Sequence, residues 1–375
     1  MRKINVLVAF GTRPEAIKMA PVVKALQADI SFNAKVLVTA QHREMLDQVL
    51  DVFNIKPDFD LDIMKPNQTL TQISSSILGK MDEVFNEFRP DIVLVHGDTL
   101  TAFVVAQSAF YNQIDIGHVE AGLRTYDLKS PWPEEGNRQL ISRIAKLHFA
   151  PTKISYQSLI SEGLKQENIY ITGNTVIDAL LSVVSQDDLP LPKLSDELFL
   201  QLDPKEKIVL ITGHRRENFG DGFKNICLAL KQLAQHNPKV KFIYPVHLNP
   251  NVKNVVNSYL SDINNIALIL PQSYLEFVNL MKHSYIILTD SGGIQEEAPS
   301  LGIPVLVMRE TTERPEAISA GTVKLVGTDQ NSIISNVQAL LDDEELYRSM
   351  SEASNPYGNG YAANQIADIL KQTYI

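Results

Sequence analysis

Residues 4–21, INVLVAFGTRPEAIKMAP, contain a short apolar run, a glycine turn and the beginning of a helix. The apolar run at residues 4–10 predicts a buried strand, and Pro14 stands where proline commonly begins a helix. Further short apolar runs alternate with segments of helical periodicity, one of which ends before Pro90. The alternation predicts right-handed βαβ units, and therefore a parallel sheet covered by helices on both faces. In the first half of the chain we expect strands at residues 4–10, 35–39, 92–96, 116–119 and 170–172.

The same alternation lapses between residues 187 and 207, where three prolines stand among acidic residues. It resumes at residue 208, so we expect a second doubly wound domain, with ligand loops at the carboxyl ends of its strands. Residues 361–375 follow a turn-rich stretch and have the spacing of one further helix. The strands expected in the second half are residues 208–212, 241–245, 267–270, 285–289, 304–308 and 323–326.

The composition disfavours several classes of protein. The chain has 375 residues and a formal net charge of −10, which argues against a long grip on nucleic acid, because that requires clustered lysine and arginine. Its single cysteine, Cys227, cannot form an internal disulfide, so we expect a reducing compartment, the cytoplasm. No run approaches the roughly 20 apolar residues of a membrane-spanning helix, and the first apolar run is too short for a signal peptide. A small ligand is the expected partner, and neither nucleic acid nor membrane.

The turn after the first expected strand carries two cations. Gly11 allows a tight turn, and a helix that begins at Pro14 exposes backbone N–H groups with a partial positive charge. Arg13 and Lys18 add formal charge nearby, so we predict an anion site. The alternative is a solvated first turn with two surface cations. The turn matches neither a P-loop nor a GxGxxG dinucleotide fingerprint.

Two further strands end in carboxylates. Asp98 and Glu120 follow the strands predicted at residues 92–96 and 116–119, so both should lie on the ligand side of the sheet. Carboxylates in such positions suit acid and base roles, although Asp98 could instead cap the helix that follows it. Glu134 and Glu135 form a third acidic pair at a predicted helix start, where the helix dipole also favours acidic residues.

The second domain has comparable strand ends. GHRREN at residues 213–218 follows its first strand, and DSGGIQEE at residues 290–297 follows a later one. A Ser-Gly-Gly turn into a helix lets backbone amides approach a pyrophosphate, and an acidic residue one turn later could hold the ribose hydroxyls. Arg314 adds a cation near the same strand ends.

A metal centre is the alternative use of the polar groups in the first domain, namely His96, Asp98, His118 and Glu120. The sequence contains no H-E-x-x-H motif, and its H-x-E lacks the P-C-x-x-C partner of the zinc deaminases. We therefore expect no metal.

Several runs carry a family resemblance: GTRPEAIKMAP (11–21), TAQHREMLDQVL (39–50), HGDT (96–99), HVEAGLRT (118–125), PWPEEGNR (131–138), GHRREN (213–218), YPVHLNP (244–250), DSGGIQEEAPSLGIPVLVMRETTERPE (290–316) and NPYGNG (355–360). Together they resemble the non-hydrolysing UDP-N-acetylglucosamine 2-epimerases, nearly end to end. The resemblance implies an α/β fold of two Rossmann-like domains with the nucleotide in an interdomain cleft, as in glycosyltransferase-B-like proteins, and a homodimer. The implied domains are residues 1–174 plus 356–375, with most catalytic carboxylates and the returning C-terminal helix, and residues 175–355, which bind UDP.

The resemblance also implies roles for individual residues. Around the sugar and diphosphate it places Arg13, Lys18, Asp98, Glu120, Glu134 and His214. Around the uridine and pyrophosphate it places Gln272, Phe277, Ser291, Gly292, Gly293, Glu297 and Arg314.

The implied activity is the reversible interconversion of UDP-N-acetylglucosamine and UDP-N-acetylmannosamine, without a metal or another cofactor. The C2 proton of the sugar is too weakly acidic for direct removal, so UDP is expected to leave as the proton is taken, which gives 2-acetamidoglucal and UDP. Proton exchange on both faces then requires at least two carboxylates from among Asp98, Glu120 and Glu134, and the sequence does not assign their order. Arg13, His214 and the turn at Ser291 are expected to stabilise the departing diphosphate.

Other functions share this architecture. A glycosyltransferase would consume UDP-sugar only with an acceptor present, and a nucleotide-sugar sensor would bind without turnover. A hydrolysing epimerase would release free N-acetylmannosamine, but such enzymes show GTRADYG where this chain has GTRPEA at residues 11–16. The product is expected to enter a cell-surface polysaccharide, which the sequence does not identify.

Bacterial members of the family bind a second UDP-N-acetylglucosamine as an activator. The resemblance places its contacts at Gln41, His42, Arg215, His247 and the shared Glu134. Two positions depart from the family pattern, because Glu44 stands where relatives can carry Gln, and Asn67 where they can carry Arg. A diphosphate would meet one added negative charge and lose one positive charge, so we expect activation that needs more effector. Alternatively, Gln41 and Glu44 merely begin a helix.

Overall fold

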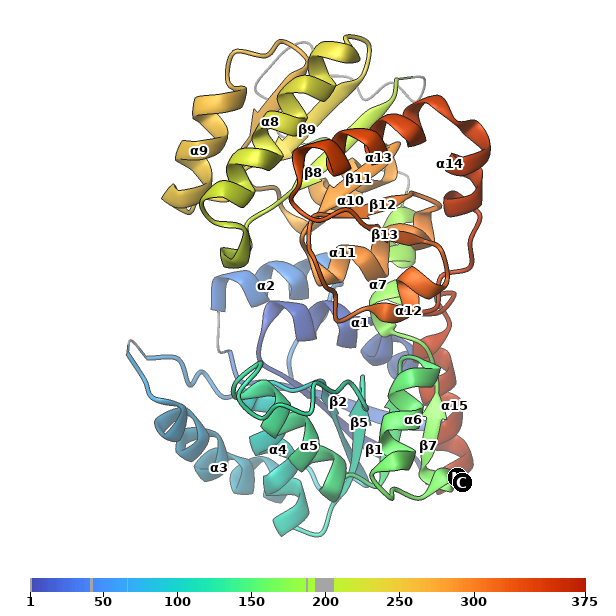
Figure 1. The fold of residues 1–375 in the computed structure, drawn as a ribbon. Coiled ribbons are helices and arrows are strands. Elements are labelled where there is room, and N and C mark those ends of the chain that lie inside the picture. The colour runs from blue at the N-terminus through green and yellow to red at the C-terminus, as the bar shows by residue number, and fades with distance from the viewer. Residues whose placement is uncertain (1, 41–42, 66, 187, 193–205) are drawn as a thin grey trace. The chain divides into compact units, whose positions relative to one another are not determined.

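The computed structural model describes residues 2–40, 43–65, 67–186, 188–192 and 206–375. The chain forms two compact units, the first made of Met1–Ala179 with Tyr357–Ile375 and the second of Leu180–Pro356. Each unit has its own parallel sheet with helices on both faces (Figure 1), so the predicted fold class of two doubly wound domains is confirmed. Most of the predicted break at residues 187–207 lies outside the described residues. Within the described ranges, no helix has the length and apolar character needed to cross a membrane.

The sheet of the first unit has seven parallel strands in the order β3-β2-β1-β4-β5-β6-β7. The chain adds strands outward from β1 to β3 and then returns to place β4 beside β1, so the direction of growth reverses between β1 and β4. Such a reversal creates a ligand site beyond the carboxyl ends of the two strands. The strands are β1 (Ile4–Phe10), β2 (Phe32–Val38), β3 (Phe59–Asp60), β4 (Ile92–His96), β5 (Asp115–Val119), β6 (Leu147–Ala150) and β7 (Ile169–Ile171).

Helices cover both faces of this sheet because alternate strand residues are buried on opposite sides. Along β1, Val6, Val8 and Phe10 belong to one buried cluster, and Leu7 and Ala9 belong to the other. Helices α1 and α15 complete the first cluster, and α3 and α4 complete the second. The helices of this unit are α1 (Arg13–Ala28), α2 (Arg43–Val52), α3 (Leu70–Glu87), α4 (Leu100–Tyr111), α5 (Glu134–Ile144), α6 (Lys153–Ser161) and α15 (Ala362–Tyr374), with α7 (Thr175–Val184) at its boundary.

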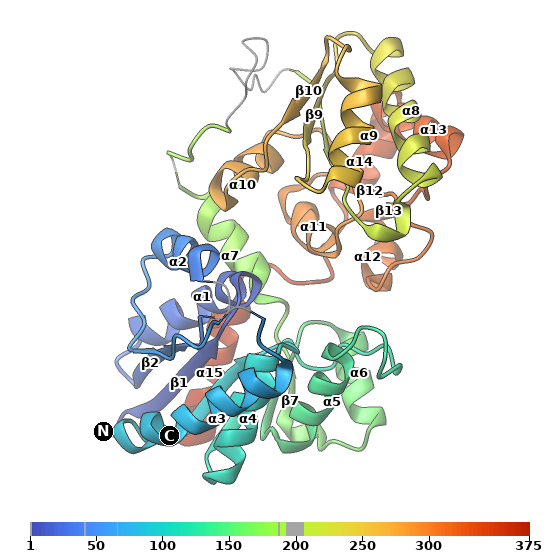
Figure 2. The same cartoon turned by 90° about the vertical axis from the view of Figure 1, so that its left-hand side faces the viewer.

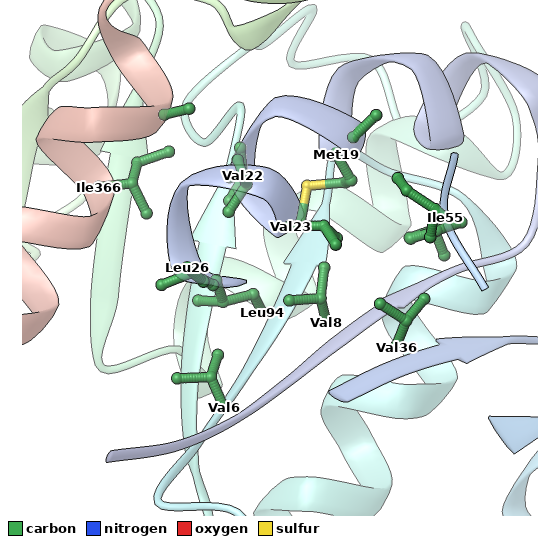
Figure 3. Close-up of a cluster of buried hydrophobic side chains, with 14 of the residues drawn as sticks. Val6, Val8, Met19, Val22, Val23, Leu26, Val36, Ile55, Leu94 and Ile366 are labelled. Carbon is green, nitrogen blue, oxygen red and sulfur yellow. The ribbon is translucent and has the colours of Figure 1, made fainter. Parts of the chain in front are cut away.

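The last helix, α15, packs against the first unit. Ile366 of α15 is fully buried in the cluster that contains Val22 and Leu26 of α1 (Figure 3). The first turn of α15 is held by Asp178 of α7, whose carboxylate accepts hydrogen bonds from the backbone N–H groups of residues 362 and 363 at 3.3 and 2.8 Å. These contacts bring the end of the chain back to the unit that contains its beginning.

The second unit repeats the plan with six parallel strands in the order β10-β9-β8-β11-β12-β13. Growth reverses here between β8 and β11. Figure 2 shows α8, α9 and α13 grouped on one face, where their apolar residues share a buried cluster with the strands. The elements are β8 (Ile208–Thr212), α8 (Asp221–His236), β9 (Lys241–Pro245), α9 (Pro250–Leu260), β10 (Ile266–Ile269), α10 (Tyr274–Lys282), β11 (Ile286–Thr289), α11 (Gly292–Glu297), β12 (Val305–Val307), α12 (Pro315–Ser319), β13 (Val323–Leu325), α13 (Gln330–Asp342) and α14 (Glu344–Ser351).

The predicted strands agree with the observed ones to within three residues at each end. Two strands were missed. β3 is only two residues long, and β6 spans four residues that include the buried polar His148, so neither has a clear apolar period. The predicted helix that ends before Pro90 is α3, which begins at a capping box formed by Thr69 and Gln72.

Candidate active site

Gly11 follows β1 at the reversal point of the first sheet. A Cβ atom at this position would stand 2.2 Å from Thr39 Oγ1 and 2.3 Å from Thr101 Oγ1, two hydroxyls that are themselves hydrogen-bonded at 2.8 Å. We predicted that this glycine serves a tight turn. The structure shows that glycine lets the two threonine side chains pack against the backbone here, because any side chain at position 11 would overlap them.

The turn after β1 is held by the buried carboxylate of Glu15. Its Oε2 accepts hydrogen bonds from the amides of Gly11 at 3.0 Å and Thr12 at 2.8 Å, and its Oε1 accepts one from Thr99 Oγ1 at 2.6 Å. Burial raises the pKa of Glu15, and these hydrogen bonds oppose the rise. The amides of Gly11 and Thr12 are therefore already bonded, and the anion site predicted at Arg13, Lys18 and the helix start stays a prediction. The carboxylate of Glu15 also ties the end of β1 to the start of α4.

Glu120 lies at the end of β5, and its hydrogen-bond partners all meet one oxygen. Oε2 is paired with Lys18 Nζ, accepts a hydrogen bond from Asn174 Nδ2 at 2.9 Å and lies 3.6 Å from His96 Nε2. No other residue in the described ranges donates a hydrogen bond to Oε1. Burial alone would raise the pKa of Glu120, but the charge of Lys18 and the nearby His96 outweigh burial and hold this pKa well below its usual value. Glu120 is therefore an ionised carboxylate with one anchored oxygen.

Asp98 follows β4 and has a similar arrangement. Its Oδ2 is paired with Arg138 of α5, and its backbone carbonyl accepts a hydrogen bond from Asn137 Nδ2 at 2.9 Å. Its side chain remains 25% exposed, and none of the described residues donates to Oδ1. Thr99 provides the cap of α4, so the alternative that Asp98 caps this helix is wrong.

Asp98 and Glu120 leave the sheet at the same edge, because β4 and β5 are adjacent parallel strands. Gly97, which precedes Asp98, lies close to Glu120, because a Cβ at Gly97 would stand 3.7 Å from Glu120 Oε1. The Gly97 carbonyl oxygen lies 2.7 Å from His118 Nε2. Burial lowers the pKa of His118 to about 3, so its neutral ring donates to this carbonyl. Among the residues that the structure describes, no group of three or more His, Cys, Asp or Glu could hold a metal ion.

Glu134 and Arg13 begin α5 and α1, and both side chains are half-buried. Neither side chain makes an ion pair or hydrogen bond with another described residue. Glu135, by contrast, is fully buried, and its carboxylate accepts hydrogen bonds from the amides of Thr125 at 3.0 Å and Tyr126 at 3.1 Å. Of the predicted acidic pair, Glu135 therefore organises the preceding loop, and the ligand role of Glu134 stays a prediction.

In the second unit, Asp290 occupies the reversal point between β8 and β11. It is fully buried, and its Oδ2 accepts hydrogen bonds from the amides of His214 and Arg215, both at 2.8 Å. Its Oδ1 has no hydrogen-bond partner in the described part of the chain and lies 3.6 Å from His214 Nδ1. The ring of His214 stacks on that of His247 with centroids 5.2 Å apart. Asp290 thus fixes this loop and faces one ring nitrogen of His214.

The Ser-Gly-Gly turn leads into α11, as predicted. A Cβ at Gly292 would stand 3.1 Å from Glu313 Oε1 and 3.7 Å from Arg314 Nη2, so the turn packs closely against these two side chains. Burial would raise the pKa of Glu313, but its hydrogen bonds and nearby arginines lower it to about 2. Arg314 is paired with the buried Glu296, whereas Glu297, which the resemblance places at the uridine and pyrophosphate, is half-buried.

The other predicted nucleotide residues follow strands β10 and β11. Gln272 follows β10 and donates a hydrogen bond to the Leu270 carbonyl at 2.6 Å, and Phe277 lies on α10. The Ser291 amide donates to Thr289 Oγ1 at 2.9 Å, and Gly293 lies in the first turn of α11. Because the strands are parallel, all these residues lie at the carboxyl edge of the second sheet.

The predicted effector site is only partly described. Gln41 and His42 lie outside the described residues, as does the side chain of Glu44 in α2. Arg215 is paired with Glu313 at 3.1 Å, and His247 is exposed. Asn67 is also exposed and has a φ of +59°.

Comparison with known proteins identifies the family. The family model for UDP-N-acetylglucosamine 2-epimerase matches residues 24–371. The chain belongs to the UDP-N-acetylglucosamine 2-epimerase family. The member from Escherichia coli (strain K12) is 57% identical over 375 residues, which cover 99% of this chain and 100% of the relative.

The solved structures that resemble this chain include some with bound ligands. The UDP-GlcNAc 2-epimerase from Neisseria meningitidis, bound to UDP-GlcNAc, is 51% identical with a TM-score of 0.87, over 98% of this chain and 100% of that chain. The S. aureus MnaA co-structure with UDP is 48% identical with a TM-score of 0.84, and the match covers 99% of this chain and 96% of that chain. The predicted resemblance to this epimerase family is therefore confirmed.

Sequence reasoning missed three residues that shape these loops. Glu15 stands three residues after Thr12, which is the spacing of a capping box. Asp290 directly follows a predicted strand, as Asp98 does, and Asn174 comes shortly after β7. Asp290 opens the DSGGIQEE run quoted above but was given no role of its own, and a check of the polar residues that follow each strand would have singled out Asn174 as well.

Proposed function

We propose that this chain catalyses the reversible interconversion of UDP-N-acetylglucosamine and UDP-N-acetylmannosamine. Membership of the epimerase family and the UDP-GlcNAc and UDP bound by its solved relatives support this proposal. The observation that carries it is the pair of carboxylates at adjacent strand ends. Asp98 and Glu120 each have one oxygen held by a cation and a second oxygen left for a substrate proton.

The chemistry requires such a pair. Removal of the C2 proton with loss of the C1–O bond gives 2-acetamidoglucal and UDP, and the C1–O bond re-forms when a proton is added to the other face of C2. One group must therefore accept a proton on one face and another must supply a proton on the opposite face. We assign these roles among Asp98, Glu120 and Glu134 without choosing their order.

The leaving diphosphate needs positive charge and hydrogen-bond donors. We assign this role to Arg13, which has no ion-pair partner among the described residues, and to His214, whose ring faces Asp290 through Nδ1. Lys18, which we expected near the diphosphate, is paired with Glu120, so its proposed part is to keep that carboxylate ionised. The uridine and pyrophosphate are assigned to Gln272, Phe277, Ser291, Gly292, Gly293, Glu297 and Arg314.

The non-hydrolysing reaction is favoured over release of free sugar by the GTRPEA run at residues 11–16. In this run Pro14 lies in the first turn of α1, and Glu15 holds the preceding turn. Hydrolysing enzymes carry GTRADYG instead, which lacks both residues.

The deciding experiment is incubation with UDP-N-acetylglucosamine in deuterium oxide, followed by NMR. We expect deuterium at C2 of both epimers, no accumulation of free sugar, and activity that survives exhaustive chelation. Inversion without isotope incorporation would contradict the elimination mechanism. Release of N-acetylmannosamine would identify a hydrolase, and consumption only with an acceptor would identify a glycosyltransferase.

We further propose a cytoplasmic homodimer whose product enters a cell-surface polysaccharide. A second UDP-N-acetylglucosamine is proposed to activate it, with weakened affinity because of Glu44 and Asn67. A sigmoidal dependence of rate on substrate, shifted to lower concentration in Asn67→Arg, is the expected sign of this effect. Since Asn67 has a positive φ that arginine adopts less readily, the variant must first be shown to fold by circular dichroism.

A further inference from the structure

We propose that Asn174 is a positioning residue that fixes Glu120 for proton transfer and ties it to the segment by which the chain re-enters the first unit. This inference rests on the proposed function, because it assumes that Glu120 handles the substrate proton. Asn174 lies after β7 and before α7, outside the residues assigned above, and is only 3% exposed.

The orientation of the Asn174 amide is fixed at both ends. Its Oδ1 accepts a hydrogen bond from the Val176 amide at 3.1 Å, so its Nδ2 must be the atom that faces Glu120, and Nδ2 donates to Oε2 at 2.9 Å. The same oxygen is held by Lys18 and lies near His96. Among the described residues, Lys18, His96 and Asn174 are the groups that face Glu120 through side-chain nitrogen atoms. Asn174 is the member of the set that carries no charge at any pH.

The backbone around Asn174 is bound to the returning chain. Its own amide donates to the Tyr357 carbonyl at 2.7 Å. Next to it, Gly173 has a φ of +86°, and a Cβ there would stand 3.0 Å from the Tyr357 carbonyl oxygen and 3.3 Å from Gly358 Cα. Asp178 holds the amides of residues 362 and 363 in the same stretch. Residues 173–178 therefore lie along residues 357–363.

This strip adjoins both points at which the chain passes between the units. The first passage falls after Ala179, within α7, and the second falls between Pro356 and Tyr357. Asn174 touches the second passage through its backbone and Glu120 through its side chain. Asn174 is therefore held on two sides, by the returning segment through its backbone and by Glu120 through its side chain.

The hydrogen bond has two chemical consequences. A donor to the ionised carboxylate favours that form, so its loss raises the pKa of Glu120. The bond also helps to fix the rotation of the carboxylate, and with it the direction of Oε1. Poorer alignment should lower kcat at all pH values, and the raised pKa should extend the loss of activity on the acid side to higher pH.

The test uses two variants that keep an oxygen able to cap α7. Asn174→Ser retains an acceptor for the Val176 amide but loses the donor to Glu120, and Asn174→Asp replaces that donor by a like charge. We expect Asn174→Ser to lower kcat by about tenfold, the usual scale for loss of a hydrogen bond to a charged group, with the dissociation constant for UDP unchanged. The limb of the kcat profile on which activity is lost with falling pH should move upward by about one pH unit. Asn174→Asp should move it further.

Asp178→Ala is the matched control, because it loosens the same strip without touching Glu120. We expect Asp178→Ala to lose activity with falling pH over the same pH range as the wild type. If Asp178→Ala moves the limb as much as Asn174→Ser, the effect is structural and the inference is overturned. A wild-type profile in both Asn174 variants also overturns it. Should Asn174→Ser fail to fold, Asn174→Asp alone decides the question. An inactive wild-type enzyme would instead refute the proposed function.

Discussion

Two kinds of carboxylate lie at the strand ends of this chain. Glu15, Glu135 and Asp290 are buried and accept hydrogen bonds from two or more backbone amides, so they hold loops in place. Asp98 and Glu120 instead pair with a cation through one oxygen and keep a second oxygen unbonded by the described residues. The distinction separates structural acids from candidate proton-transfer groups, although both kinds occupy similar motifs.

The first residue-scale prediction concerns the proton-transfer acids. We expect Asp98→Asn and Glu120→Gln each to lower kcat by at least about 10²-fold, the usual scale of general acid–base catalysis, with UDP affinity nearly intact. Both changes keep the size of the side chain and remove its basicity. Steady-state rates and calorimetric UDP binding measure the two effects, and the exposed Asp368→Asn serves as control. Normal turnover at saturation, with poor UDP binding, would show that the assigned roles are wrong.

The second prediction concerns the nucleotide loops. Ser291→Ala and Arg314→Lys should weaken UDP binding by roughly tenfold and leave kcat at saturation nearly unchanged. Both changes remove hydrogen bonds proposed to reach UDP, and neither alters Asp98 or Glu120. Arg314→Ala is a poorer test, since it leaves Glu296, which is 2% exposed, without its cation and should destabilise the fold. Isothermal titration with UDP gives the affinity. An unchanged UDP affinity in both variants would remove these residues from the site.

At the scale of elements, one side chain connects two helices that are distant in sequence. Asp178 belongs to α7, yet it caps α15, which begins almost two hundred residues later. Burial raises the pKa of Asp178, and the two amides lower it. Helix α15 is thus held to the first unit by its buried apolar face and by the hydrogen bonds from its first turn to Asp178.

The element-scale prediction follows from this cap. Asp178→Ala should cost about 1–2 kcal/mol in the stability of the α15 attachment, as loss of a helix cap commonly does. The amide protons of Ala362 and Ala363 should therefore exchange with solvent faster than in the wild type. Asp368→Ala, on the exposed side of α15, is the control and should leave both rates unchanged. Equal protection in Asp178→Ala would mean that the cap contributes little.

At the scale of the whole molecule, buried histidines make stability depend on pH. His118 and His148 are neighbours on β5 and β6, and burial lowers their pKa values to about 3 and about 4. Between those values and the unfolded value of about 6.5, the unfolded chain binds protons that the folded chain does not. The contribution of these histidines to the free energy of unfolding is therefore fully present above about pH 6.5, and it decreases as the pH falls below that value.

This linkage gives a quantitative prediction. Between about pH 7.5 and pH 5.5, the two histidines together should remove roughly 2–3 kcal/mol from the free energy of unfolding. His118→Gln, which keeps a donor for the Gly97 carbonyl, should flatten this dependence by about half. Urea denaturation at several pH values measures the slope, and the exposed His236→Gln should not change it. A slope equal to that of the wild type in His118→Gln would contradict the buried neutral assignment.

Much of this fold was predictable because its signals are local. An apolar run such as residues 92–96 is typical of a strand buried on both faces, and Pro14 and Pro90 stand at the start of α1 and just after the end of α3. The strand-end position of Asp98 and Glu120 follows from the same periodicity. β3 and β6 escaped prediction because a two-residue strand and a strand with a buried histidine carry too little apolar period of their own.

The sequence by itself determined the alternation of strands and helices, the two-domain plan and the candidate acids, since each depends on residues that are close along the chain. Only the tertiary structure decided which acids hold loops and which remain available. Lys18 and Glu120 are separated by 102 positions, as Asn174 and Glu120 are by 54, and no local pattern records such a pairing. The side-chain contacts that set the charge and direction of a carboxylate arise only when distant strands reach the same edge of a sheet.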